Sequence, residues 1–200
     1  MVLSDQEIEK LVHSQKLIIP FKKDRLQSVS YDISTSETIR VYQRLNNPIN
    51  LNDKTQLELA TVDVNISSGY HIKPGEYILV KTEELFNIPD NLSARIRPRT
   101  TFTRFGLLLI DQHLNPSFSG HLYLGLYNAT PNIINIFPDV QVGQIVFEQV
   151  KGEITKDRLY KNQAGAKYQN ETSFIVPRLD KESEHNNRIQ ALIEKALAAD

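Results

Sequence analysis

The residues best suited to bind an anionic ligand lie together in one nonapeptide, Arg99–Leu107, which reads RTTFTRFGL. Arg99 and Arg104 lie five residues apart around the hydroxyls of Thr100 and Thr101. Guanidinium groups bind phosphate oxygens in pairs, and short hydroxyl side chains let a phosphate chain come close. These residue types predict a phosphate-binding segment, although the same letters also suit an exposed basic strand that ends in a turn.

The composition limits the classes of protein to which the chain can belong. Two hundred residues, of which 40% are hydrophobic, suffice for one sizeable domain with a buried core. A formal net charge of −1 at pH 7 gives no bulk attraction to nucleic acid or to an anionic membrane, so neither is expected as a partner. The absence of cysteine excludes disulfides, thiolate metal sites and cysteine nucleophiles.

The N-terminal residues do not resemble a secretory signal, because Asp5, Glu7 and Glu9 replace the long apolar run that a signal needs. Apolar stretches elsewhere are far shorter than the ~20 residues of a membrane helix. We therefore expect a cytoplasmic protein. The five histidines are scattered without the spacing of metal ligands, so we expect no metal site built from side chains.

Helix signals lie at both ends of the chain. Ser4 and Glu7 fit a capping box and predict a short amphipathic helix over residues 5–14. Near the other end, an apolar stripe predicts a helix over about residues 182–198, formed by Ile189, Leu192, Ile193 and Leu197. This second helix could pack on the body of the protein or on a neighbouring subunit.

The sequence between these helices is typical of short strands. Apolar and polar residues partly alternate over 57–66, and the turn signal Pro74-Gly75 divides 71–80. Further strands are expected at 93–97, 105–110, 121–127, 132–136 and 142–150. Turn signals recur every ten or so residues, which predicts a mainly β fold of the sandwich or barrel type. The polar segment 151–172 suits a surface loop or a segment that folds over a ligand.

Seven separated segments follow one another in the order and spacing of the motifs of one family. They are VLSDQEI (2–8), LQSVSYD (26–32), KPGEY (73–77), RTTFTRFGL (99–107), NPSFSG (115–120), the segment 137–147 that ends in GQIVF, and KYQN (167–170). Together they resemble the dCTP deaminases, which share a superfamily with the trimeric dUTPases. The resemblance covers roughly residues 2–172.

This resemblance implies a distorted jelly-roll or β-barrel of the dUTPase-like type, with short N- and C-terminal helices. It also implies a domain over residues 1–178 followed by a C-terminal helical extension over 179–200. The implied assembly is a homotrimer with its sites at the subunit interfaces. The implied ligand is a deoxynucleoside triphosphate that carries Mg²⁺ on its phosphates.

The resemblance also assigns roles to individual residues. Thr100 and Arg104 are implied to act beside the catalytic water. The residues implied to bind the nucleotide are Arg99 and Thr101, together with Tyr160, Lys167 and Glu171 from a C-terminal lid. Glu171 stands where the family motif ends in glutamine, so a carboxylate near the triphosphate or base would alter selectivity unless it faces solvent.

The chain departs from the family at the residues that should move protons. The deaminases use a strand glutamate, for which this sequence has Gly125. The dUTPases orient the attacking water with an aspartate, for which it has Asn115. An amide can hold a water but cannot take its proton at neutral pH. Asp111 is a candidate replacement, because strand alternation would place it on the same face as His113, although both also suit an exposed strand end.

Three functions follow from these observations. The first is hydrolytic deamination of dCTP to dUTP in the supply of dTTP precursors, with or without diphosphatase activity on dUTP. The second is a catalytically inactive homologue that binds a nucleotide in a sensing or regulatory role. The third is an enzyme that acts on a modified nucleotide, since Gly125 in place of glutamate is expected to open space beside the base.

Overall fold

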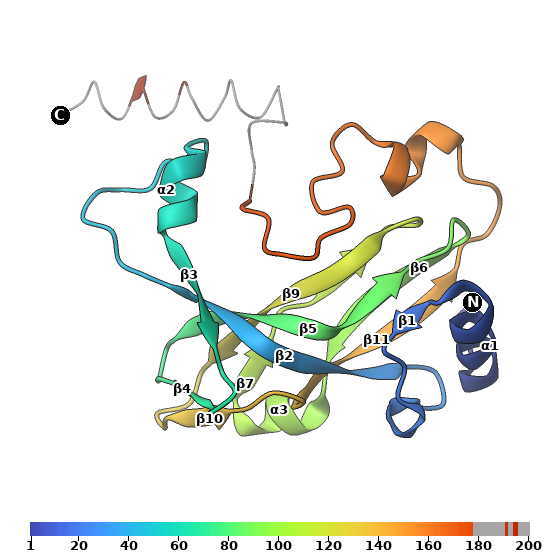
Figure 1. Cartoon of the computed structure of the whole chain (residues 1–200), viewed down its shortest axis with the longest axis horizontal. Helices are drawn as coiled ribbons and strands as arrows, with labels where there is room; N and C mark the ends of the chain where they lie inside the picture. The colour runs from blue at the N-terminus through green and yellow to red at the C-terminus, as the bar shows by residue number, and fades with distance from the viewer. Residues whose placement is uncertain (178–190, 192–193, 196–200) are drawn as a thin grey trace.

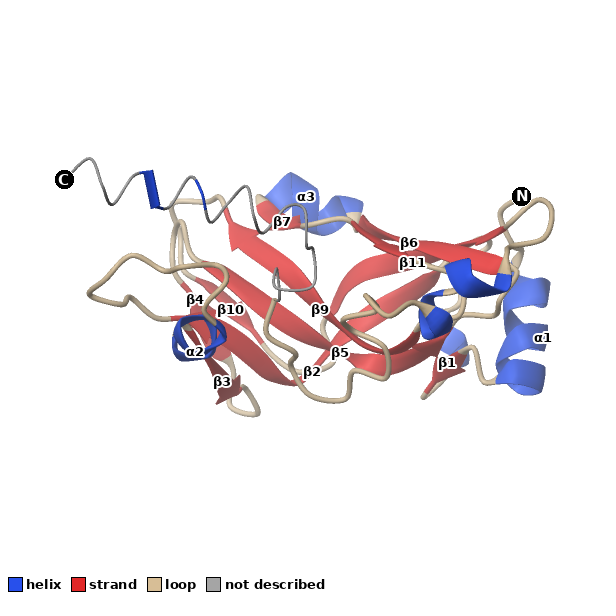
Figure 2. Cartoon of the chain, turned by 90° about the horizontal axis from the view of Figure 1, so that it is seen from above, coloured by secondary structure: helices blue, strands red, loops and turns tan. Residues whose placement is uncertain are grey.

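A curled sheet of nine strands dominates the molecule (Figure 1). The structure is a computed structural model that describes residues 1–177, 191 and 194–195. The nine strands are β1 (Ile18–Ile19), β2 (Tyr31–Tyr42), β3 (Thr61–Asn65), β5 (Tyr77–Asn87), β6 (Leu92–Pro98), β7 (Leu107–Leu109), β8 (Gln112–Leu114), β9 (Ser119–Asn128) and β11 (Gln141–Gln149). Their order is β7-β9-β5-β2-β11-β6-β8, with β1 paired to β5 and β3 paired to β2. A separate ribbon joins β4 (Tyr70–Ile72) to β10 (Ile134–Ile136). The expected mainly β, barrel-like fold is confirmed, since the sheet curls into a half-barrel (Figure 2).

The two faces of the central strands serve different purposes. In β5, Ile78, Val80 and Phe86 are fully buried in the core, while Tyr77 and Leu79 point to the opposite face. This alternation follows from the two-residue period of a strand, in which neighbouring side chains leave the sheet on opposite sides. The curl of the sheet lets one face fill with aliphatic side chains and leaves the other face to line a cavity.

Two of the three described helices were not expected from the sequence. Residues 54–59 form α2 (Lys54–Leu59), capped by the side chain of Asp53, which accepts a hydrogen bond from Gln56 N at 3.1 Å. The expected strand over 57–66 is therefore wrong for its first residues and begins at Thr61. The partial alternation of leucines did not reveal this N-cap, which satisfies the free N–H groups of the first turn.

The anion-binding nonapeptide is also helical. α3 (Thr100–Phe105) follows Arg99 and ends at Gly106, whose φ of 88° suits glycine. Strand β7 then covers 107–109 rather than 105–110. The alternative of an exposed basic strand is therefore wrong, and both threonines lie on the first turn of a helix.

The first described helix agrees with its prediction. α1 (Asp5–Gln15) begins after Ser4, whose hydroxyl accepts a hydrogen bond from Glu7 N at 3.4 Å. The predicted helix over 182–198 falls largely outside the described residues. Residues 151–177 run along the upper side of the sheet with two short 3-10 turns, at 156–158 and 160–162 (Figure 1). Among the described residues, helices are too short or too polar to span a membrane.

Candidate functional site

A cavity of about 580 Å³ lies between the sheet and residues 159–177, hereafter the C-terminal segment. Seven of its lining side chains are aromatic: Tyr42, Tyr77, Phe118, Tyr123, Tyr160, Tyr168 and Phe174. Pockets of this size, with apolar walls and a few polar groups, are typical of small-molecule sites. Aromatic faces also suit stacking against a planar ring. The cavity is therefore a candidate site for a small molecule with a planar ring.

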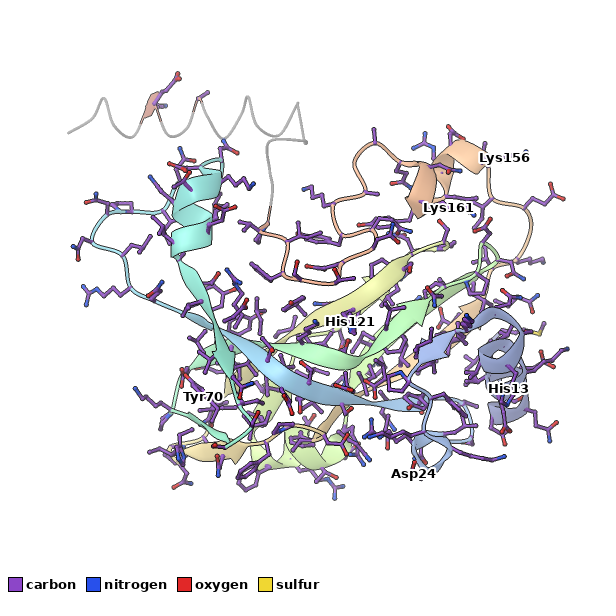
Figure 3. The ribbon with its side chains drawn as sticks, in the orientation of Figure 1. His13, Asp24, Tyr70, His121, Lys156 and Lys161 are labelled. Atoms are coloured by element: carbon purple, nitrogen blue, oxygen red, sulfur yellow. The ribbon has the colours of Figure 1, made fainter. Side chains whose placement is uncertain are left out.

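The C-terminal segment is fixed to the start of β9 by main-chain and side-chain hydrogen bonds. The side chain of Gln169 bonds to the main chain on both sides of Phe118, donating to Ser117 O at 3.1 Å and accepting from Ser119 N at 3.3 Å. Glu171 pairs with Gly120 in a parallel bridge, and its carbonyl accepts from His121 N at 2.8 Å. Figure 3 shows His121 on β9 and Lys161 in the segment above it. The C-terminal segment, which forms the roof of the cavity, is thus held against the sheet by several hydrogen bonds.

Gly120 is required for this close approach. Its φ is 146°, and a Cβ at this position would lie 2.9 Å from Glu171 N. Both the backbone conformation and the contact favour glycine, because a side chain would push a main-chain atom away. The segment can therefore lie directly against the strand only while position 120 has no side chain.

Phe174 holds the far end of the roof. Its ring lies edge-on to Tyr123, with centroids 5.1 Å apart, and the Arg40 guanidinium lies 4.1 Å from its centroid. Cation–π and edge-to-face contacts each contribute on the order of 0.5–1.5 kcal/mol. Lys81 Nζ adds a hydrogen bond to Thr172 O at 2.8 Å.

Glu171 places a buried carboxyl group in the cavity. Its residue exposure is 6%, and Oε1 accepts a hydrogen bond from Ile175 N at 2.8 Å. Burial raises the pKa of Glu171 to about 7, against the opposing effects of the Ile175 hydrogen bond and the charge of Lys81. The group can therefore exchange its proton near neutral pH, where an ordinary glutamate stays ionised.

The residues proposed to act on water are dispersed. Asn115 and His113 line the cavity and are exposed, whereas Asp111 forms an ion pair with Arg97 at 2.7 Å. Asp111 is not among the residues that line the cavity, and its pairing with His113 stays a prediction.

The anion-binding segment lies away from the cavity of the same chain. α3 lies along the lower edge of the sheet in Figure 1, and the C-terminal segment lies along the upper edge. Thr100, Thr101 and Arg104 are exposed, while Arg99 donates to Gln141 Oε1 at 3.0 Å and lies 3.6 Å from Asp32. Arg99 is therefore engaged in holding β2 and β11 beside α3.

The three predicted lid residues occupy one segment but not one place. Tyr160 and Glu171 line the cavity, and Tyr160 N donates to Pro116 O at 3.1 Å. Lys167 is half-buried and lies outside the cavity lining. The sequence reasoning missed the aromatic walls from other elements, above all Tyr42, Tyr77 and Tyr123, because their positions are far apart in the chain and share no spacing.

Comparison with known proteins identifies the family. A family model described as dCTP deaminase-like matches residues 2–150. The dUMP-forming dCTP deaminase of Corynebacterium glutamicum is 30% identical over 177 residues, which cover 84% of this chain and 91% of the relative. The dCTP deaminase of Campylobacter curvus is 26% identical over 189 residues, which cover 88% of this chain and 97% of the relative. The chain belongs to the dCTP deaminase-like family.

The fold of this family member agrees with that assignment. The crystal structure of 2′-deoxycytidine 5′-triphosphate deaminase from Agrobacterium tumefaciens superposes with a TM-score of 0.60 at 20% identity. The match covers 73% of this chain, and this chain spans about half, 48%, of that one. At this identity the similarity shows the fold alone. Family membership places the chain among nucleotide-processing proteins.

Position 125, where the resemblance implies the family's glutamate, is closed in this deaminase-like chain. A Cβ on Gly125 would lie 2.0 Å from the hydroxyl oxygen of Tyr77 and 2.7 Å from its Cζ. The expectation that Gly125 opens space beside the base is therefore wrong, because the Tyr77 side chain fills that space. Where the resemblance implies a carboxylate, the strand is covered by the phenol of Tyr77. A phenol can donate a hydrogen bond but does not accept a proton at neutral pH.

Proposed function

We propose that this protein binds a deoxynucleoside triphosphate whose base enters the aromatic cavity. The observation that carries the proposal is the cavity of about 580 Å³ with seven aromatic side chains and one buried carboxyl. Flat apolar walls favour a planar base, and a single polar side chain can fix its orientation. The sugar and phosphates of the bound nucleotide would extend out of the cavity on its exposed side, beside Asn115 and His113.

The triphosphate is proposed to bind Thr100, Thr101 and Arg104 of a second copy in a homotrimer. Support comes from the separation of α3 from the cavity within one chain and from the exposure of these three side chains. Arg99 would position the helix through Gln141 and Asp32 and add positive charge. The half-buried Lys167 would approach the phosphates from the roof.

The proposed reaction is the hydrolytic deamination of dCTP to dUTP. Water adds to the ring carbon that carries the amino group, and ammonia leaves. An amide such as Asn115 can hold a water but cannot take its proton, so another group must accept the proton that the attacking water loses. The aromatic walls would orient the ring and exclude bulk water.

Mg²⁺ is proposed to enter with the nucleotide. Within the described residues there is no group of three His, Asp or Glu side chains that could hold a metal ion. Phosphate oxygens would supply its ligands, and its contribution would be to neutralise their charge. Arginine and threonine side chains of the anion-binding segment fit such a partly neutralised chain, because both can donate hydrogen bonds to phosphate oxygens.

The test is incubation of the full chain with dCTP and with dUTP in the presence of Mg²⁺, followed by chromatography of the products. The proposal expects dCTP to be converted to dUTP or dUMP, and calorimetry to show saturable binding.

Arg104→Ala should weaken binding of the nucleotide about 10- to 100-fold, the effect of losing one charge-assisted hydrogen bond. Arg44→Ala, which also removes an exposed arginine, is the matched control and should leave binding unchanged. Absence of binding to either nucleotide would reject the proposal.

A second candidate function is nucleotide binding without turnover. The observation that favours it is the closure of Gly125 by Tyr77, together with the amide at Asn115. The same experiment distinguishes the two functions. Saturable binding with unchanged dCTP and dUTP would favour a sensing or regulatory role over deamination.

A further inference from the structure

Glu171 is the acidic side chain among the sixteen residues that line the cavity. Its backbone is fixed at both sides, by the bridge to Gly120 and by the bond from His121 N. Oε1 is engaged by Ile175 N, and among the described residues no second donor is bonded to the carboxyl. Because Glu171 lines the cavity, a ligand there could supply the partner of the other oxygen.

The groups around this carboxyl leave its charge largely uncompensated. Lys81 on β5 provides the attractive charge, but its Nζ is bonded to Thr172 O at 2.8 Å. Tyr123 on β9 has its pKa raised to about 12 by burial, so it remains neutral. His113 on β8 lines the exposed side of the cavity, and Tyr160 lines it from the C-terminal segment itself. Burial dominates in this setting, and both protonation states of Glu171 are accessible near neutral pH.

We propose that Glu171 determines which pyrimidine binds, through the type of hydrogen bond that it offers. A neutral carboxyl donates to a ring oxo group, as in a uracil base. A carboxylate accepts from a ring amino group, as in a cytosine base. This inference rests on the proposed binding of a deoxynucleoside triphosphate and assigns its base selectivity to one residue.

The consequence is a selectivity that changes with pH. The affinity for the oxo ligand follows the protonated fraction of Glu171, and the affinity for the amino ligand follows the ionised fraction. The ratio of the two affinities should therefore fall by up to about tenfold for each pH unit. Titration of the triphosphate cancels in this ratio, because both nucleotides carry the same phosphates.

The experiment measures the binding of dUTP and of dCTP with Mg²⁺ to the full chain at pH 6, 7 and 8. Calorimetry at 5 °C limits turnover, and chromatography of the recovered nucleotides restricts the comparison to intact ligand. The variants are Glu171→Gln, which keeps an oxygen acceptor for Ile175 N but cannot ionise, and Glu153→Gln, which removes an exposed carboxyl from the preceding loop. The wild type and Glu153→Gln should show a dUTP-to-dCTP affinity ratio that falls with pH. Glu171→Gln should show a ratio that does not change with pH.

A ratio independent of pH in the wild type, or one with an unchanged slope in Glu171→Gln, would overturn the inference while leaving nucleotide binding intact. Binding of neither nucleotide at any pH would overturn the proposed function and this inference together. A wild-type ratio that does not change with pH would overturn the inference even if Glu171→Gln does not fold.

Discussion

At the scale of single residues, the buried carboxyl of Glu171 couples stability to pH before any ligand binds. Burial raises its pKa from 4.5 to about 7, so the folded protein holds this proton more tightly than the unfolded chain does. Below pH 4.5 both states are protonated, and the group contributes nothing. Between pH 4.5 and 7 the unfolded chain releases the proton first, so folding becomes less favourable as pH rises.

The prediction concerns the difference in unfolding free energy between Glu171→Gln and the wild type. Between pH 5 and pH 8 the wild type should lose on the order of 1–3 kcal/mol of unfolding free energy relative to Glu171→Gln, because glutamine has no proton to lose. Urea unfolding at the two pH values measures it. A constant difference across this range would show that Glu171 titrates normally.

Gly125 and Tyr77 form a coupled pair on the wall of the cavity. Gly125→Ala should destabilise the wild type, because its Cβ would displace the Tyr77 ring. In a Tyr77→Leu background the same change should be neutral or stabilising, because alanine suits a strand interior better than glycine by roughly 0.5–1 kcal/mol. A double-mutant cycle in thermal unfolding should give a coupling energy of about 1 kcal/mol.

The control for this cycle is Gly165→Ala, whose Cβ would meet nothing within 4 Å. Its effect should be the same in both backgrounds. Additive effects of Gly125→Ala and Tyr77→Leu would contradict the contact between them.

At the scale of elements, the C-terminal segment depends on its contact with β9. Gly120→Ala introduces a side chain at a φ of 146° and 2.9 Å from Glu171 N, so the segment should separate from the strand. Limited trypsin digestion should then cleave faster at Arg158, Lys161 and Lys167, at least tenfold if the substitution lowers the free energy of releasing the segment by ~1.4 kcal/mol or more. Gly165→Ala should digest at the wild-type rate. Unchanged cleavage in Gly120→Ala would show that the roof is held by other contacts.

Sequence periodicity predicted some elements and failed for others, for identifiable reasons. β6 and β11 alternate regularly, and α1 has its capping serine, so their positions were predicted to within a few residues. β2 was missed because its first five residues are buried on both faces and include Ser34 and Thr35. Ser34 is accommodated by bonds to Glu84, which also pairs with the buried Arg25 at 2.7 Å. A buried polar network of this kind removes the alternation on which strand prediction depends.

At the scale of the whole molecule, α3 is flanked by apolar side chains that one chain leaves uncovered. Phe105 is 61% exposed and Ile110 is 49% exposed. The proposed homotrimer would bury them and bring the neighbouring copy's anion-binding segment to the cavity. Phe105→Glu should therefore lower the average mass in light scattering from trimer toward monomer. Leu59→Glu, a change at an exposed apolar residue on the distant α2, is the control and should not alter the mass.

A monomeric wild-type protein at tens of micromolar would contradict the trimer.

The candidate site could be predicted only in part from the sequence. The anion-binding segment and the lid residues lie in short motifs, so their residue types were visible before folding. The aromatic side chains of the cavity wall come from positions between 42 and 174, and only the curl of the sheet brings them together. The sequence could not predict that the Tyr77 ring occupies the space beside Gly125, because the two residues are 48 positions apart and meet only across paired strands.

The most direct test of the central claim is a crystal structure of the full chain grown with dUTP and Mg²⁺. The account predicts the base between the aromatic walls, within hydrogen-bond distance of Glu171. It also predicts the phosphates on Arg104, Thr100 and Thr101 of a neighbouring copy. An empty cavity at saturating nucleotide, or phosphates bound away from α3, would contradict it.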